Sequence, residues 1–540
     1  MKRLVLVSAC LLINLTLILA QQGPGSTLTL PDLSDDVRAV ENAPVTVPGP
    51  DLLPVPLPAL PPPLPQEEEI RIPESALTAT GRIDILPGQI RNDTYGEAMV
   101  GAFLWDGLAA HLSLYRPSSD PSFSIIFSHE TQDGFAFHDA GSGFSYRETT
   151  LQGNFRGGKD QGLFWSLTGA FTDQSNGLQG QSQDFSSISH RYLTLNPAIR
   201  LPLGVLTAYS ELSGSSAALS LERGQHPVTG DVRAQELGLR PTVGIEWARE
   251  AFRISLEGAY TFYGLINNPA SVADRDRLVQ QGELTLASSF DISPALQTGA
   301  SLGIGTNTAL VWYVPFALWF DAGLNDYVSL SVKGGFESKV RSLRDIWELN
   351  PYTDIGGEPS VDAHWFAGAV INLYPAKAMT LRLAGDWKSS SGNTGETILM
   401  NFQSGSSRAL YSYESRPFNK LNTRLELRNS WHSADAVLGW AAQWLDRDTQ
   451  RVHEVYGSLE YRAEDDRYGT ALTSSIALDA NGVDLPRLDT NAYVRLGSGI
   501  RLIGDIQDLF AAFRGSEGRI RWEPYLEKGF QAGLRLQFSL

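Results

Sequence analysis

The sequence predicts an all-β protein, in which one large antiparallel transmembrane β-barrel of about 18 to 22 strands makes up most of the chain. Three observations lead to this fold class. Apolar and polar residues alternate with the strand period in many segments after residue 96. Several segments keep the alternation for about 9 to 11 residues, the length of a tilted strand that crosses a bilayer. Their polar rows carry charges in mid-strand, and aromatic residues gather near strand ends.

The N-terminus resembles an export signal. Met1 to Arg3 is basic, the following run up to Leu19 is mostly apolar, and Ala20 offers a small residue at a cleavage point. We therefore expect a signal peptide over residues 1–20. A lipid anchor on Cys10, within "LVSAC", is the competing interpretation, but the apolar run continues beyond Cys10 and favours export.

Composition excludes several classes of protein. The chain carries 43 Lys and Arg against 60 Asp and Glu, a formal net charge of −17, so it has no electrostatic reason to bind nucleic acid. Cys10 is the only cysteine, which leaves a mature chain without disulfides, zinc-thiolate sites or cysteine nucleophiles. After residue 20 no segment approaches the ~18 consecutive apolar residues of a membrane helix, so a membrane crossing must use strands.

Residues 21–95 differ from the rest of the chain. Their centre, "VPGPDLLPVPLPALPPPLPQEEE" (Val47 to Glu69), is too rich in proline for a helix or a strand ladder and favours an extended polyproline spacer. We predict a Pro-rich disordered periplasmic arm that reaches an envelope partner.

Residues 96–540 are predicted to form the barrel. Alternating strands run through Phe252–Phe262, Met379–Trp387 and Leu421–Leu427, and short turn signals between such segments indicate antiparallel hairpins. One of these signals, "DANGVD" (Asp479 to Asp484), also resembles a calcium loop, but Asn481-Gly482 between two strands is typical of a tight turn.

A soluble β-sandwich is the alternative for such alternating strands. Sandwich strands are usually about 5 to 6 residues long, shorter than several of those found here. Because no backbone group can stay unpaired in hydrocarbon, a membrane-spanning sheet must close on itself.

The last strand, in "GFQAGLRLQFSL" (Gly529 to Leu540), indicates which face meets lipid. We expect Leu534, Leu536, Phe538 and Leu540 to form the lipid-facing row of a C-terminal insertion strand. Arg535, Gln537 and Ser539 then face a wet lumen, and the strand pairs with the first one. Placing Arg535 in lipid instead would cost ~2 to 4 kcal/mol near the midplane.

A barrel of this size encloses a wide lumen that is normally filled. The sequence is compatible with three ways of filling the lumen. The strand-connecting segments fold inward, with residues 337–360 and 505–528 as the longest candidates, or residues 21–95 enter the lumen, or another protein caps it.

The C-terminal segment "GDIQDLFAAFRGSEGRIRWEPYLEKGFQAGLRLQFSL" (Gly504 to Leu540) resembles the end of TonB-dependent receptor barrels. The matching residues are Asp508, Leu509, Phe510, Tyr525, Gly529 and Phe538. A second segment, "LRDIWELNPYTDIGGEP" (Leu343 to Pro359), is similar to an Asn-Pro segment of that family at Asn350 and Pro351.

This resemblance covers residues 96–540 and not the N-terminal plug domain of the family, for which too few residues follow the Pro-rich tract. The segment "EEEIRIPESALTATG" (Glu67 to Gly81) is interpreted as an acidic linker edge rather than as a degenerate energy-coupling box. The resemblance implies a barrel in the outer membrane of a diderm bacterium, in contact with its lipid and inserted by the barrel assembly machinery. It also implies solute uptake or passage across that membrane.

Charged residues on the polar rows are candidates for setting the selectivity of such a passage: Arg382, Arg424, Glu426, Arg428 and Arg535. Mutually paired charges on a solvated lumen wall are the simpler interpretation. A structural or adhesive surface barrel that displays loops without transport is the alternative function. The chain shows no Gly-x-Ser-x-Gly elbow and no zinc-spaced histidines, so we expect no enzyme, cofactor or metal site.

Overall fold

A computed structural model describes residues 94–539 apart from 118, 160–161, 224–231, 268–277, 356–360, 391–395, 403–408, 446–451, 480–481, 484 and 515–518. The expected signal peptide, almost all of the Pro-rich arm and Leu540 lie outside the described residues. Two short helices occur in the described part, α3 (Leu343–Leu349) and the 3-10 helix η1 (Leu509–Phe513). The strands are β1 (Tyr95–Phe103), β2 (Gly107–Arg116), β3 (Ser122–Asp133), β4 (Ser145–Gly158), β5 (Phe164–Gly177), β6 (Phe185–Leu203), β7 (Leu206–Arg223), β8 (Val232–Arg249), β9 (Phe252–Asn267), β10 (Leu278–Ser293), β11 (Leu296–Asn307), β12 (Phe316–Asn325), β13 (Val328–Val340), β14 (Val361–Ala376), β15 (Met379–Ser389), β16 (Glu396–Phe402), β17 (Tyr411–Arg416), β18 (Asn419–Ser430), β19 (Ala434–Leu445), β20 (Val452–Arg462), β21 (Tyr468–Asp479), β22 (Gly482–Val483), β23 (Arg487–Gly497), β24 (Ile500–Gln507), β25 (Ile520–Trp522), β26 (Tyr525–Leu526) and β27 (Gln531–Ser539).

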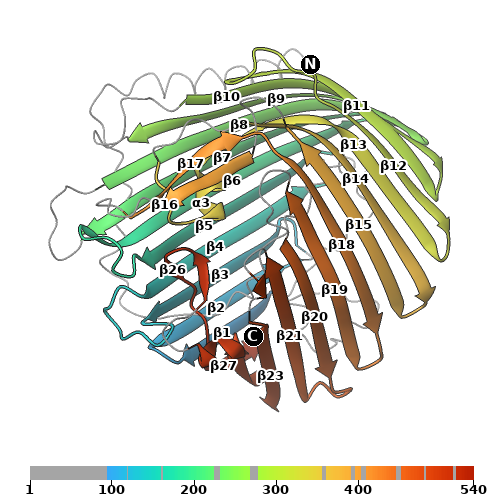
Figure 1. Cartoon of the computed structure of the whole chain (residues 1–540). Coiled ribbons are helices and arrows are strands. Elements are labelled where there is room, and N and C mark those ends of the chain that lie inside the picture. Colours follow the sequence, from blue (N-terminus) through green and yellow to red (C-terminus); the bar gives the residue numbers. More distant parts are fainter. Residues whose placement is uncertain are drawn as a thin grey trace. The chain divides into compact units, whose positions relative to one another are not determined.

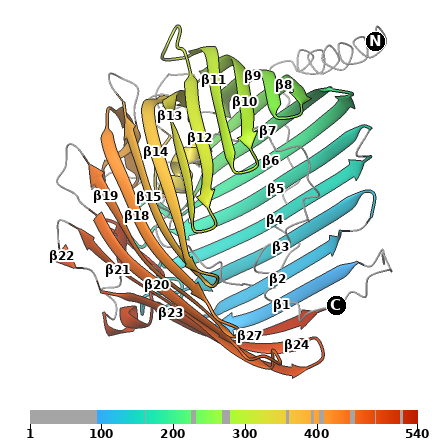
Figure 2. The same cartoon turned by 90° about the vertical axis from the view of Figure 1, so that its right-hand side faces the viewer.

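The main sheet is a closed antiparallel barrel (Figures 1 and 2). Each of its strands pairs with the next one along the chain, except that β15 pairs with β18, β21 with β23 and β24 with β27. The two-residue strand β22 pairs only with the last residues of β21. Without it the described barrel has 22 full strands, the upper end of the predicted range.

The barrel closes where the first and last strands meet. β1 pairs with β27 in a continuous antiparallel register from Glu97 opposite Ser539 to Phe103 opposite Gly533. The predicted pairing of the terminal strand with the first one is therefore confirmed. This closure matters because an open edge would leave a row of backbone N–H and C=O groups without partners in hydrocarbon.

The two faces of the wall differ as the alternation predicts. Large apolar side chains lie exposed on the outward face, such as Val243 (58%), Leu302 (60%) and Leu534 (60%). Leu536 and Phe538 share the outward row with Leu534, while Arg535 and Gln537 face inward and contact Asp505 and Glu97. A continuous apolar outer surface is what acyl chains solvate. Within the described residues no helix has the length and hydropathy of a membrane span.

Turn lengths distinguish the two ends of the barrel. At one end the strands are joined by short turns such as 250–251, 294–295, 326–327, 377–378 and 498–499, and β1 begins and β27 ends there. The other end carries the three longest connections, residues 341–360, 390–418 and 508–530. Transmembrane barrels place short turns in the periplasm and longer loops outside the cell. This rule predicts that the long connections lie at the extracellular end.

The lipid-facing assignment predicts the effect of a new charge on β8. Val243→Arg would place a guanidinium on the outward row and should destabilise the barrel by about 2 to 4 kcal/mol. Thr242→Arg, one residue away, points its side chain into the lumen opposite Glu211 of β7 and should cost far less. The free energy of unfolding of both variants can be measured by urea titration in lipid vesicles, with heat-modifiable gel mobility to detect the folded barrel. Equal destabilisation by the two variants would contradict the assignment.

Candidate functional site in the barrel lumen

Three connections fold into the barrel and pack together. We call the described parts of residues 341–360, 390–418 and 508–530 the lumenal loop cluster. Figure 1 shows α3, β16 and β17 in front of the strands β5 to β8. Buried side chains from all three connections form one core with the inward faces of β6, β7 and β8 and the residue after β5. The cluster contributes Leu343, Ile346, Trp347, Tyr352, Ile355, Leu410, Tyr411, Tyr413 and Tyr525, and the wall contributes Leu178, Phe185, Ile188, Tyr192, Ala217, Leu219, Leu221, Val232 and Ala234.

The helix α3 begins at a capping box. The Ser342 side chain accepts a hydrogen bond from the Asp345 backbone N–H, and the Asp345 side chain accepts one from the Ser342 backbone N–H at 2.8 Å. Leu343, Ile346 and Trp347 recur at helical spacing and are buried. The helix therefore presents one apolar face to the wall.

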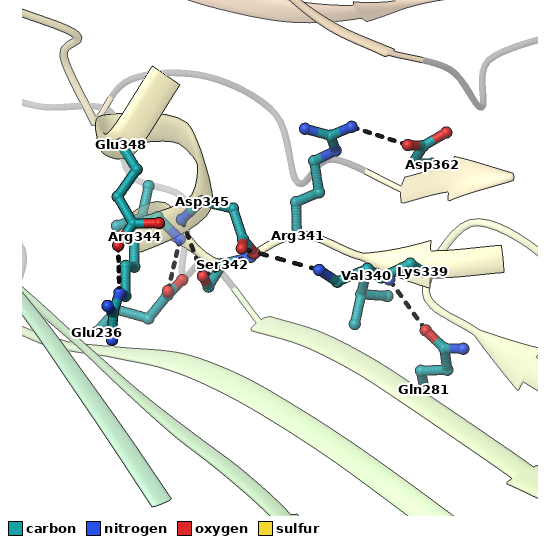
Figure 3. Close-up of polar contacts among 11 residues, drawn as sticks. Glu236, Gln281, Lys339, Val340, Arg341, Ser342, Arg344, Asp345, Glu348 and Asp362 are labelled. Carbon is teal, nitrogen blue, oxygen red and sulfur yellow. Dashed lines mark hydrogen bonds and ion pairs between the residues drawn. The ribbon is translucent and has the colours of Figure 1, made fainter. Parts of the chain in front are cut away.

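A buried carboxylate of the wall holds the start of α3. The backbone N–H of Leu343 donates to Oε1 of Glu236 on β8 at 2.6 Å, and Glu236 is only 1% exposed (Figure 3). A negative charge at a helix N-terminus interacts favourably with the free N–H groups and the helix dipole. Just before the helix, Arg341 pairs with Asp362 of β14 at 2.8 Å. These contacts fix both the position and the direction of the segment.

Tyrosines link the three connections to one another. The rings of Tyr352 and Tyr525 stack with centroids 3.6 Å apart and planes 4° from parallel. The Tyr525 hydroxyl donates to the Ala409 carbonyl at 2.5 Å, and the Tyr411 hydroxyl donates to the Glu523 carbonyl. Burial raises the pKa of both Tyr352 and Tyr525 above the ordinary value. Residues far apart in sequence thus form one packed unit.

The third connection is tied to the wall by polar contacts. The Gln179 side chain donates to the Leu526 carbonyl at 3.0 Å and accepts from the Leu526 N–H at 2.8 Å, which imitates a β-ladder pair. Lys528 pairs with Glu130 of β3. Within the connection, buried Asp508 accepts two hydrogen bonds from Arg519, of 2.9 and 3.0 Å.

The residues matching the family motifs lie in the lumenal loop cluster, except for Phe538, which lies on β27 of the wall. Asp508 precedes η1, in which Leu509 and Phe510 are the first two residues. Asn350 ends α3, and its side-chain oxygen accepts the Tyr352 N–H at 2.8 Å, with Pro351 between them. The described residues show the first of the three predicted ways of filling the lumen, because the described parts of the candidate segments 337–360 and 505–528 fold inward. The other connection of the cluster, residues 390–418, was not among these candidates, because its "NTG" (393–395) is typical of a short hairpin turn.

The charged selectivity candidates separate into two groups. Arg382 on β15 and Arg424, Glu426 and Arg428 on β18 lie together on adjacent inward rows, with Arg382 directly opposite Glu426. Arg535 lies on β27, in another part of the wall, and forms a buried ion pair with Asp505. The structure therefore brings four of the five residues together.

A tyrosine that the sequence interpretation missed organises this group. Tyr456 of β20 lies across Gly439 of β19, where even a Cβ atom would meet its ring at 2.1 Å. Its hydroxyl accepts a hydrogen bond from Arg424 Nε at 2.6 Å and donates one to Glu426 at 2.9 Å. Glycine at 439 is thus the structural requirement for this contact.

No protein-family model matches the sequence, and no curated protein matches it. Solved structures with the same fold do exist. The siderophore receptor PirA from Acinetobacter baumannii is 9% identical with a TM-score of 0.61, and the match covers 84% of this chain and 81% of PirA. The FrpB iron transporter from Neisseria meningitidis (F3-3 variant) is 10% identical with a TM-score of 0.64, over 84% of this chain and 82% of FrpB. A mutant ferric enterobactin receptor PfeA from Pseudomonas aeruginosa, in complex with enterobactin, is 12% identical with a TM-score of 0.61, over 84% and 82%.

These likenesses define the fold as that of the TonB-dependent receptor barrels. They confirm the resemblance drawn from the C-terminal segments at the level of architecture.

The two hydrogen bonds of Gln179 predict how the third connection is held. Gln179→Ala should raise the hydrogen exchange of the backbone amides at 519–527 because it removes both bonds to Leu526. Gln183→Ala, an exposed glutamine in the same turn, should leave that exchange unchanged. Mass spectrometry of the detergent-solubilised barrel measures it. Unchanged protection in both variants would show that Gln179 does not hold this connection.

The stacked tyrosines predict a loss of the cluster in alkali. Burial raises the pKa of Tyr352 in the packed cluster, whereas in an opened cluster it returns towards its ordinary value of 10.0. The stabilisation is therefore complete below that pH and is lost as the pH rises above it. After a jump to alkaline pH, part of the tyrosinate absorbance should appear slowly, and Tyr352→Phe should reduce that slow part. Immediate ionisation of all tyrosines would argue against a buried stack.

Proposed function

We propose that this protein passes a solute across the outer membrane of a diderm bacterium, through a lumen that its own connections narrow. One observation carries the proposal: a closed wall with inward charged and polar rows surrounds a packed cluster of inward-folded connections at one end. A barrel of this strand number encloses a lumen rather than a solid core. Structures of the same fold are named as a siderophore receptor and an iron transporter, which supports a role in uptake.

The surroundings of the barrel follow from this proposal. The outward apolar face contacts outer-membrane lipid, and the barrel assembly machinery inserts the chain through its terminal strand after export. The Pro-rich arm extends into the periplasm from the end where β1 begins and reaches an envelope partner there. The protein acts as a passage and not as an enzyme, and it works without a cofactor.

The loop cluster is placed to restrict passage on one side of the lumen. Its apolar contacts are with the wall around β5 to β8, which lies about half a turn of the 22-strand ring from β15 and β18. The exposed side chains of Arg382, Arg424 and Arg428 lie on that second part of the wall. The solute then passes beside the cluster along the wall that carries these charges.

Planar-bilayer conductance tests the proposal. The purified wild-type barrel should give a small conductance, and replacing residues 343–354 by a short Gly-Ser segment should increase it severalfold because α3 and the Tyr352 stack are removed. Heat-modifiable mobility of both proteins controls for folding. Folded barrels without conductance in either form would contradict passage and favour the structural or adhesive surface barrel.

A further inference from the structure

We propose that Arg382, Arg424 and Arg428 form an anion-binding surface on the lumen wall, so that the solute is an anion carrying carboxylate or phosphate groups. The inference deepens the proposed function and rests on it for the direction of transport. The binding surface itself stands on the geometry of β14, β15, β18 and β19.

The three arginines surround a single carboxylate. In the ladder between β15 and β18, Arg382 is opposite Glu426, and Arg424 and Arg428 occupy the two diagonal positions on the same inward face. Diagonal neighbours in such a ladder are ~7 to 8 Å apart, within reach of long side chains. All three arginines are exposed, and Glu426 is half-buried.

The one carboxylate is already engaged. Glu426 accepts the Tyr456 hydroxyl at 2.9 Å and lies 3.5 Å from Arg424 Nη2. Within the described residues, neither Arg382 nor Arg428 has a carboxylate within ion-pair distance. A paired lumen wall, the simpler interpretation of these charges, therefore accounts for Arg424 but not for the other two.

Two further acids border these arginines on the neighbouring strands. Asp435 of β19, opposite Ser430, is diagonal to Arg428 on the inward face. Glu454 of β20, opposite Ala441, interacts electrostatically with Arg424. On β14 the inward row carries Phe366, Gly368, Val370 and Asn372, and Asn372 is opposite Arg382. On β19 the inward residues opposite Arg428, Glu426 and Arg424 are Val437, Gly439 and Ala441. The nearest other acid on β15 is Asp386, which accepts a hydrogen bond from Asn422 at 2.9 Å. Arg382 and Arg428 nevertheless keep guanidinium groups that no carboxylate of the described residues pairs with, and these two groups are available to bind an anion.

Guanidinium groups suit this role because each is permanently charged and presents a planar set of donors that matches a carboxylate or a phosphate. The surface lies close to the short turns 377–378 and 431–433, away from the lumenal loop cluster. An anion that has passed the cluster would meet the surface before it leaves the barrel. Positive charge on a pore wall raises the local concentration of anions and lowers that of cations.

The experiment uses the full-length barrel and a triple variant, Arg382→Gln, Arg424→Gln and Arg428→Gln. Reversal potentials in a KCl gradient should show anion preference in the wild type and its loss in the triple variant. Arg233→Gln removes an exposed arginine from the outward row of β8 and should leave the preference unchanged. Heat-modifiable mobility checks that each variant is folded.

A second readout does not depend on conductance. Calorimetric titration with citrate and with tripolyphosphate at low salt should show binding to the wild type that weakens at least tenfold in the triple variant. The two probes separate carboxylate from phosphate preference. If both proteins conduct, and the triple variant keeps the wild-type selectivity and anion binding, this inference is overturned while the proposed passage is supported. If the barrel does not conduct but the wild type binds the anion and the triple variant does not, the proposed passage is overturned and the binding surface is supported. Absence of both conductance and binding would overturn both.

Discussion

The structure depends on the pairing of every strand edge in a medium that offers backbone groups no water. β1 and β27 meet from Glu97 to Phe103, and this one pairing turns a row of hairpins into a closed wall. Once the wall is closed, each strand has one face in lipid and one in the lumen. Arg535 shows the consequence, because a guanidinium that would be costly outside forms a buried pair with Asp505 inside.

Closure also creates the need for the lumenal loop cluster. A ring of 22 strands is too wide for its own inward side chains to fill. The longest connections therefore supply an apolar core of their own, which packs against one side of the wall. Tyr352, Tyr525 and Glu236 hold that core by stacking and by buried hydrogen bonds. The short strand pairs β16–β17 and β25–β26 add backbone hydrogen bonds to it. The wall thus depends on continuous strand pairing, whereas the cluster depends mainly on the packing of buried side chains.

The alternation of residues predicted the barrel and its lumen face, because a period of two is a local property that burial imposes on every strand. The range of about 18 to 22 strands came from the length of residues 96–540. The same alternation placed Arg382, Arg424, Glu426 and Arg428 on the inward rows. It could not show that Arg535 is apart from them, since register and closure arise from contacts between distant strands. It also missed Tyr456 over Gly439 and the stack of Tyr352 on Tyr525, which depend on tertiary packing that no local pattern encodes. The expected lipid contact of Leu540 lies outside the described residues.

The most direct test of the account is a scan of single cysteines along β11, from Leu296 to Asn307, in proteoliposomes. A spin label at Leu302 should be relaxed by oxygen dissolved in the bilayer, and a label at Ser301 by a water-soluble chelate, with the two responses alternating along the strand. That result would establish lipid on one face and water on the other. Labels that respond alike to the water-soluble chelate at every position would contradict the membrane-spanning barrel.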